Sequence, residues 1–303
     1  MSTYHTPVLL KESIDGLVVN PEGTYVDVTY GGGGHSNEIL KRLKNGRLIA
    51  FDQDADSETN VHADKRLIFV RQNFIYLKNN LKYLGFGKVD GLIADLGVSS
   101  HQFDQSTRGF SYRQEGPLDM RMNMNADFSA ADLINQYSVE DLRRVFWELG
   151  EVKNARKLAA CINRGKADVD IDTIEVFLEV IKPCVPSINE YKYLARVFQA
   201  LRIEVNQEMD ALRKLLKQSV EVLGESGRLV VISYHSLEDR LVKNYIKYGD
   251  FKPVLETDIY GNRLVPFEAM NRKVIVPSQE EIDRNPRARS AKLRIAIRKP
   301  IHD

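Results

Sequence analysis

Residues 26–40, VDVTYGGGGHSNEIL, place four consecutive glycines between a β-branched run and the start of a helical pattern. A tight turn needs one residue without a side chain, whereas four glycines give up far more backbone freedom on folding. Glycines also allow positive φ and let a ligand touch the main chain. The stretch therefore predicts a ligand-binding turn between a first strand and a first helix, with an ordinary tight turn as the alternative.

Short apolar runs alternate with helical patterns on both sides of this turn. Strands are expected at 24–30, 47–52, 66–70 and 89–96, with a helix at 75–84. Such alternation is typical of a doubly wound α/β fold with a parallel sheet. Strand patterns return at 228–234, 272–276 and 292–298, after a helix at 207–224 and around a helix that begins near Leu237.

The strand rhythm stops between residues 111 and 205. Helices are expected there at 138–150, 151–165, 173–183 and 189–205, the first with Ser138 as its cap. The simplest organisation is one α/β domain formed by residues 1–110 and 206–303. A helical insertion, residues 111–205, interrupts it.

Composition limits the classes of function. The chain has 303 residues, 43% of them hydrophobic, and a net charge of only +1, so any nucleic-acid surface must be local. The two cysteines, Cys161 and Cys184, form no metal-binding spacing and are expected to be buried thiols. No spacing requires a metal. Without a signal-peptide pattern or an apolar run of about 18 residues, we expect a cytoplasmic protein.

Three nucleotide ligands compete for the glycine turn. A phosphate-binding P-loop needs lysine after its last glycine, but His35 and Ser36 follow here. A dinucleotide fingerprint would place its last glycine on Ser36 or Asn37. S-adenosylmethionine carries a cationic sulfonium and no phosphate, so it suits a turn with acidic neighbours.

Acidic neighbours are present at the expected strand ends. Asp27 lies in the first strand, Asp52 ends the second and Asp95 ends the fourth. A carboxylate at the position of Asp52 can accept hydrogen bonds from both hydroxyls of a ribose. Because unpaired carboxylates are costly at buried strands, the three together favour a nucleoside site.

Seven motifs, in one order along the chain, resemble the bacterial methyltransferases that modify the N4 amine of a cytidine in 16S ribosomal RNA. They lie at 5–10 (HTPVLL), 27–36 (DVTYGGGGHS), 90–100 (DGLIADLGVSS), 108–122 (RGFSY and GPLDMRM), 198–206 (FQALRIEVN), 232–240 (ISYHSLEDR) and 285–294 (NPRARSAKLR). The resemblance implies a class I S-adenosylmethionine-dependent methyltransferase fold, doubly wound and Rossmann-like. It also implies that the inserted all-helical domain recognises the substrate.

The resemblance carries over a set of S-adenosylmethionine contacts by matching positions. They are Gly33, Gly34, His35, Asp52, Phe74, Asp95 and Gln102. Phe74 is expected to cover the adenine. Tyr30 stands where phenylalanine is common, and His101 takes a position usually held by proline, which affects the turn that carries Gln102.

The cytosine amine is a weak nucleophile because its lone pair is delocalised into the ring. Asp95 or the carbonyls beside it are expected to accept an N–H of this amine and so help to localise the lone pair. The short polar motif that amino-methyltransferases usually carry here, Asn/Asp-Pro-Pro-aromatic, is replaced by DLGVSS. His235 is a candidate for substrate placement or proton transfer, with a structural histidine as the alternative; Glu238 and Asp239 are expected to cap the next helix.

RNA contacts are expected from two groups of basic residues. The insertion has 13 basic and 15 acidic residues, whereas residues 284–299 hold seven Lys or Arg and no acid. Phosphate contacts are expected from Arg287, Arg289, Lys292 and Arg294 in this run and from Arg108, Arg113 and Arg121 before the insertion. Phe110 and Tyr112 are candidates for stacking on a base that is splayed out of the RNA.

These observations predict an S-adenosylmethionine-dependent rRNA cytosine-N4 methyltransferase whose partner is 16S rRNA within the small ribosomal subunit. One alternative is a non-catalytic RNA-binding assembly factor that keeps a methyltransferase fold. Another is an NAD-dependent reductase, which the glycine spacing disfavours. The sequence does not choose between a monomer and a homodimer, and no membrane partner is expected.

Overall fold

The computed structural model describes residues 7–254, 265–271 and 273–300. The chain divides into two compact units, an α/β unit of residues 1–97 with 209–303 and a helical unit of residues 98–208. The helical unit begins at Val98, before the expected boundary at residue 111, because Val98, Phe103 and Phe110 pack into the helical core. Motif residues His5 and Thr6 lie outside the described residues.

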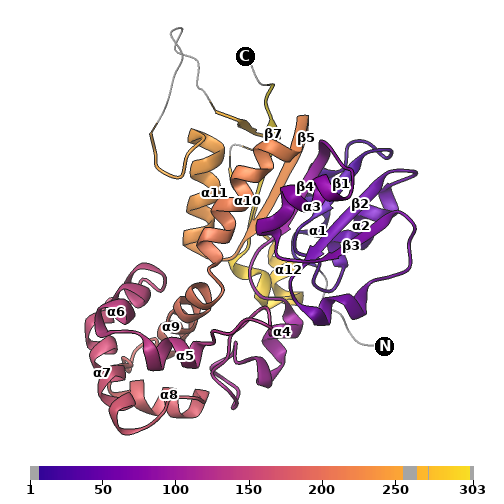
Figure 1. Cartoon of the computed structure of the whole chain (residues 1–303). Coiled ribbons are helices and arrows are strands. Elements are labelled where there is room, and N and C mark those ends of the chain that lie inside the picture. Colours follow the sequence, from indigo (N-terminus) through magenta and orange to yellow (C-terminus); the bar gives the residue numbers. More distant parts are fainter. Residues whose placement is uncertain (1–6, 255–264, 272, 301–303) are drawn as a thin grey trace. The chain divides into compact units, whose positions relative to one another are not determined.

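The α/β unit is built on a seven-stranded sheet with the order β3-β2-β1-β4-β5-β7-β6 (Figure 1). Its strands are β1 (Thr24–Asp27), β2 (Arg47–Asp52), β3 (Leu67–Arg71), β4 (Val89–Asp95), β5 (Leu223–Ser233), β6 (Phe267–Ala269) and β7 (Lys292–Arg298). The first five pair in parallel, and β7 and β6 are antiparallel. The carboxyl ends of β1, β2 and β4 therefore meet at one edge, where the predicted site residues lie.

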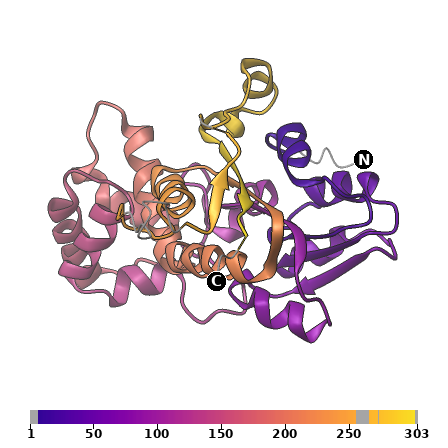
Figure 2. The ribbon, with the colours of Figure 1, turned by 90° about the horizontal axis from the view of Figure 1, so that it is seen from above.

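Successive side chains of a strand point to opposite faces of the sheet, and each face has its own apolar core. Tyr25 and Ile93 join the core of one face, and Val26 and Leu92 join that of the other. The first face is covered by α1 (Leu10–Leu17) and α2 (Gly34–Arg42), the second by α3 (Leu77–Tyr83), α10 (Glu208–Val222) and α11 (Ser236–Tyr248). Figure 2 shows α1 and α2 on one side of the strands and α3 and α10 on the other. Both faces are buried, as a parallel sheet requires.

The helical unit has its own core. Its helices are α4 (Ser100–Asp104), α5 (Ala130–Gln136), α6 (Val139–Glu148), α7 (Ala155–Asp168), α8 (Ile174–Ile181) and α9 (Glu190–Val205). The expected cap at Ser138 is confirmed, since its hydroxyl accepts the N–H of Asp141 at 3.2 Å. Every buried residue of this core belongs to the same unit. Cys161 and Cys184 are buried free thiols in it, as expected.

The described residues also form several 3-10 turns and one short helix. They are the 3-10 turns η1 (Ala55–Asn60), η2 (Phe74–Tyr76), η3 (Ser106–Arg108), η4 (Lys182–Cys184) and η5 (Pro286–Ser290), and the helix α12 (Gln279–Arg284). Among the described residues no helix is long and apolar enough to cross a membrane.

The prediction of a strand at 272–276 was wrong. Arg272 lies outside the described residues, and in 273–276 only Ile275 forms a bridge, to Leu293. The side chain of Asn271 accepts the backbone N–H of Ile295 at 3.1 Å, so it takes a donor that a further strand would need. The short strand β6 occupies the edge instead.

Candidate active site

The glycine turn connects β1 to α2. Gly33 has φ 76°, and a Cβ there would lie 2.7 Å from the hydroxyl of Tyr30. A Cβ on Gly34, the first residue of α2, would lie 2.1 Å from Cγ of Pro7. These two glycines are therefore required by the protein's own packing. Gly31 (φ 51°) and Gly32 are partly exposed, although the carbonyl of Gly31 already accepts a hydrogen bond from the side chain of Asn60 at 3.3 Å.

Asp52, at the end of β2, is hydrogen-bonded to the turn. Its Oδ2 accepts the backbone N–H of Gly31 at 2.7 Å, and its Oδ1 accepts that of Asp54 at 2.9 Å. Burial raises the pKa of Asp52, while the N–H groups of Asp54 and Gly31 act in the opposite direction. Each carboxylate oxygen has a second lone pair, so Asp52 can hold the turn and still accept a hydroxyl.

Asp27 braces the same turn from inside. It is only 1% exposed, and it accepts the N–H of Thr29 at 3.0 Å and the hydroxyl of Ser36 at 2.7 Å. Burial raises the pKa of the Asp27 carboxyl against the opposing effect of His35. The strand-end carboxylates thus differ: Asp27 is an internal acceptor, whereas Asp52 and Asp95 are partly exposed.

Asp95 ends β4 and is held from several elements. Its Oδ1 accepts the hydroxyl of Tyr234 at 2.8 Å, and its backbone N–H donates to the hydroxyl of Thr29 at 2.7 Å. Nδ1 of His35 lies 3.7 Å from Oδ2. Burial raises the pKa of Asp95 to about 6, although His35 and Tyr234 both lower it. The carboxylate therefore changes charge just below neutral pH.

His35, in the first turn of α2, is buried. Its Nε2 lies 3.1 Å from the carbonyl oxygen of Val8. Because a carbonyl only accepts, Nε2 carries the proton, and in the neutral ring Nδ1 offers a lone pair toward Asp95.

The remaining predicted cofactor residues lie in different units. Phe74 begins η2, after β3, and packs partly buried against the core beneath α3 and α10. Gln102 belongs to the helical unit, where its side-chain oxygen accepts the N–H of Ser99 at 3.0 Å in a capping box. The structure thus groups Gly33, Gly34, His35, Asp52, Phe74 and Asp95 on the α/β unit, and Gln102 is engaged within the helical one.

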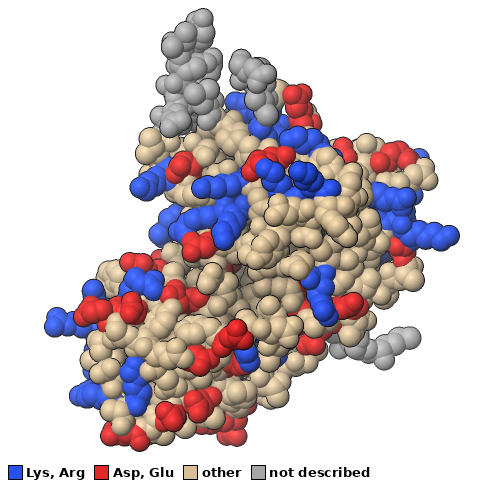
Figure 3. All heavy atoms as spheres, in the orientation of Figure 1, with Lys and Arg blue, Asp and Glu red and all other residues tan. Residues whose placement is uncertain are grey.

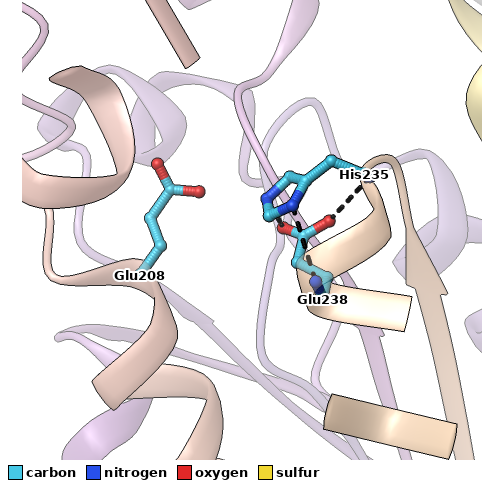
Figure 4. A group of neighbouring side chains, drawn as sticks. All are labelled: Glu208, His235 and Glu238. Carbon is cyan, nitrogen blue, oxygen red and sulfur yellow. Dashed lines mark hydrogen bonds and ion pairs between the residues drawn. The ribbon is translucent and has the colours of Figure 1, made fainter. Parts of the chain in front are cut away.

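His235 caps α11 (Figure 4). Its Nδ1 accepts the backbone N–H of Glu238 at 3.5 Å, and Glu238 Oε2 accepts the N–H of His235 at 3.3 Å. Nε2 lies 3.2 Å from Glu238 Oε1 without hydrogen-bond geometry. The same Oε2 accepts the N–H of Tyr234 at 2.9 Å. The expectation that Glu238 caps the helix is confirmed, and His235 shares that role.

Two of the predicted RNA contacts are internal to the helical unit. Arg108 is 3% exposed and donates to the carbonyls of Arg121 and Met122 at 3.1 and 3.0 Å. Arg121 is paired with Asp119 through Nη2 at 2.6 Å. The phosphate contact expected of Arg108 is therefore corrected to a structural role, because its guanidinium is inside the unit.

The two aromatic residues that were predicted to stack on a base, Phe110 and Tyr112, also differ in burial. Phe110 is buried in the helical core, which removes it as a stacking partner. Arg113 is exposed, and its guanidinium lies 5.8 Å from the ring centroids of both Tyr112 and Tyr191. Tyr191 is 69% exposed. Of the predicted RNA residues, Arg113 is thus exposed and Tyr112 partly exposed, whereas Tyr191 beside them was not predicted.

The C-terminal basic run divides between internal and exposed residues. Arg294 and Lys292 of β7 pair with Asp239 at 2.7 and 3.3 Å, so Asp239 is an ion-pair partner and not the expected helix cap. Arg287 and Arg289 lie on η5 and are exposed. Of the four residues of this run that were expected to contact phosphates, Arg287 and Arg289 are thus the exposed ones.

A further basic surface was not predicted. A groove of about 490 Å³ lies beside β6 and β7, with an apolar floor that includes Phe267 and Ile295. Its cations include Lys243 and Lys247 of α11, together with Lys299. Figure 3 shows Lys and Arg side chains gathered on the face of the α/β unit that carries α10 and α11. The spacing of four residues between the two α11 lysines is the signal that could have predicted it.

The sheet order, the glycine turn after β1 and the carboxylates that end β2 and β4 define a class I S-adenosylmethionine-dependent methyltransferase. The model of the MraW methylase family matches residues 2–299. The chain belongs to this family.

Close relatives carry one name, Ribosomal RNA small subunit methyltransferase H. The chain is 59% identical to that of Parabacteroides distasonis over 297 residues, 97% of each chain. It is 57% identical to that of Bacteroides thetaiotaomicron over 298 residues, 98% of each. Among solved structures, an rRNA methylase from Streptococcus thermophilus is similar with a TM-score of 0.42 and 11% identity, covering 95% of both chains.

Proposed function

We propose that this protein transfers a methyl group from S-adenosylmethionine to the N4 amine of a cytidine in the 16S rRNA of the small ribosomal subunit. The names of relatives at 53–59% identity support the substrate class. The observation that carries the chemistry is Asp95, a carboxylate at the carboxyl end of the sheet with its pKa raised to about 6. We further propose a cytoplasmic location, where small subunits are made.

The residues of the α/β unit fit the cofactor. Gly31 and Gly32 are partly exposed and carry no side chain, which lets a ligand approach closely, and Asp52 retains acceptor capacity for a ribose hydroxyl. Phe74 offers a partly exposed ring for the adenine. When bound, S-adenosylmethionine supplies an electrophilic methyl group on its sulfonium. The protein's part is to bind it and to orient the amine toward it.

Asp95 suits the reacting amine in its ionised form. A carboxylate accepts an N–H of the cytosine amine and so stabilises the positive charge that develops on nitrogen as the new bond forms. With a pKa of about 6 it is ionised at pH 7.5 and basic enough to take the proton that the amine releases. The hydroxyl of Tyr234 holds it in place.

The exposed basic residues suit an RNA backbone. We propose that the helical unit recognises the substrate through Arg113 with Tyr112 and Tyr191, a group that can stack on an unpaired base. On the α/β unit the exposed Arg287 and Arg289 can contact phosphates, which give affinity without sequence preference.

Transfer of labelled methyl to small subunits that lack the modification tests this function, with nucleoside analysis of the digested RNA. We expect the label in N4-methylcytidine from the wild type. Asp95→Asn is the matched control, since it keeps the shape of the side chain and removes its charge. Label in another nucleoside, or equal transfer by both proteins, would contradict the proposal.

A further inference from the structure

Tyr234 lies between the last residue of β5 and the cap of α11. Its hydroxyl donates to Oδ1 of Asp95 at 2.8 Å. Because β4 and β5 are parallel neighbours, with Asp95 opposite Ile232, the two strand ends bring the carboxylate and the phenol together. This contact joins residues 139 positions apart.

The backbone of Tyr234 is itself fixed. Its N–H donates to Glu238 Oε2 at 2.9 Å, and Glu238 also receives the N–H of His235 in the capping box. The ring packs against the core beneath α1 and α2. The start of α11 therefore determines where the Tyr234 hydroxyl points, and its partner is a carboxylate of the proposed site.

The groups that face Asp95 come from three elements and from the connection between β5 and α11. His35 of α2 and the Tyr234 hydroxyl lower its pKa, whereas Asp27 of β1 and Glu238 of α11 raise it, in addition to burial. Tyr234 faces Asp95, Glu238 and Glu281 of α12, and burial together with these carboxylates raises its own pKa well above the ordinary value. The phenol thus keeps its proton and remains a donor throughout the neutral range.

We propose that Tyr234 is a positioning residue for methyl transfer, which orients the Asp95 carboxylate and stabilises its ionised form. One lone pair of Oδ1 is then used by the phenol, and Oδ2 is left for the substrate amine. This inference rests on the proposed function only in the role given to Asp95. The hydrogen bond and its effect on the titration of Asp95 can be measured without substrate.

The test is Tyr234→Phe, which removes the hydroxyl and keeps the ring. The pKa of Asp95 is read by carboxyl carbon NMR of the labelled full chain, and the pH profile of kcat is measured beside it. A hydrogen bond to a charged group is worth enough that the Asp95 titration and the acid limb of kcat should both move up by about one pH unit. The variant's KM for RNA should stay near the wild-type value.

Tyr245→Phe is the matched control. Tyr245 is a buried tyrosine of α11 that stacks on Phe251, 5.0 Å between ring centroids, and it does not face Asp95. Removal of the Tyr245 hydroxyl should leave the Asp95 titration and the acid limb of the kcat profile unchanged. An unshifted Asp95 titration in folded Tyr234→Phe would overturn the inference. A shifted titration without N4-methylcytidine from the wild type would instead support the inference and contradict the proposed function.

Discussion

Arg294 of strand β7 donates to Oδ1 of Asp239 of helix α11 at 2.7 Å, and this contact joins the two elements. Lys292 of the same strand reaches the other oxygen at 3.3 Å. Both partners of the Arg294 pair are largely shielded from solvent. Lys292 and Arg294, two of the four residues that were predicted to contact RNA phosphates in this run, thus form ion pairs within the α/β unit.

Asp239→Asn should destabilise the protein in a pH-dependent way. Burial alone would raise the pKa of Asp239, but Arg294 and Lys292 outweigh it, so the pKa is lowered. A lowered pKa means stability that is present above the unfolded value, about 4, and lost as pH falls through the folded value. Thermal melts should show a lower Tm for the variant at pH 7, with the difference shrinking toward pH 3. A constant difference across that range would contradict the pairing.

Arg287→Ala with Arg289→Ala should weaken RNA binding and leave stability unchanged, because both side chains are exposed. The slope of log affinity against log salt should become shallower by roughly 0.7–0.9 for each lost phosphate contact. Affinity for S-adenosylmethionine should not change. Arg294→Ala is the comparison: it should lower Tm. An unchanged salt slope in the double variant would move the RNA surface elsewhere, with the Lys243 and Lys247 groove as the next place to test.

Asp52→Ala should weaken S-adenosylmethionine binding by roughly tenfold to a hundredfold, the loss of a charge-assisted hydrogen bond. Calorimetry measures this, and Glu58→Gln, an exposed acid of the neighbouring η1 turn, is the control. Wild-type affinity in folded Asp52→Ala would remove Asp52 from the site. Gly33→Val is a poorer test, because its φ of 76° and the nearby Tyr30 make the substitution strain the fold.

Asp95→Asn should lose most methyl transfer, by about 10²–10⁴-fold in kcat, if the carboxylate accepts the amine proton. The wild-type rate should fall as pH drops through about 6. Because the folded pKa is raised, ionised Asp95 costs stability that is recovered when it is protonated. The variant should therefore melt above the wild type at pH 8, and this advantage should shrink at pH 5. A variant less stable than the wild type at pH 8 would contradict the burial cost.

His235→Asn separates helix capping from proton transfer. Asparagine caps helices well and does not titrate near neutral pH, so stability and kcat should remain near wild type. His235→Ala should lower the free energy of unfolding by about 0.5–2 kcal/mol through loss of the cap. A stable His235→Asn protein with kcat reduced a hundredfold would restore a chemical role for His235.

Local patterns were sufficient for the elements and for much of the cofactor site. Strands β2 and β7 begin and end where the sequence pattern predicts, because a short apolar run is a signal that acts within a few residues. The turn at Gly33 and the carboxylates of Asp52 and Asp95 could be placed at one sheet edge for the same reason: parallel strands bring their carboxyl ends together. The resemblance then supplied the chemistry.

Which charges are available was decided only by the tertiary structure. Arg294 and Arg287 look alike in sequence, yet one meets Asp239 across the fold and the other remains exposed. Asp27 and Asp95 both end strands, yet one is enclosed by Thr29 and Ser36 and the other accepts the hydroxyl of Tyr234, 139 residues further along the chain. The local sequence determines the position of a side chain along its helix or strand. Its burial and its ion-pair partner depend on residues that only folding brings near. Burial and pairing in turn determine the pKa of the side chain and whether it can contact a ligand.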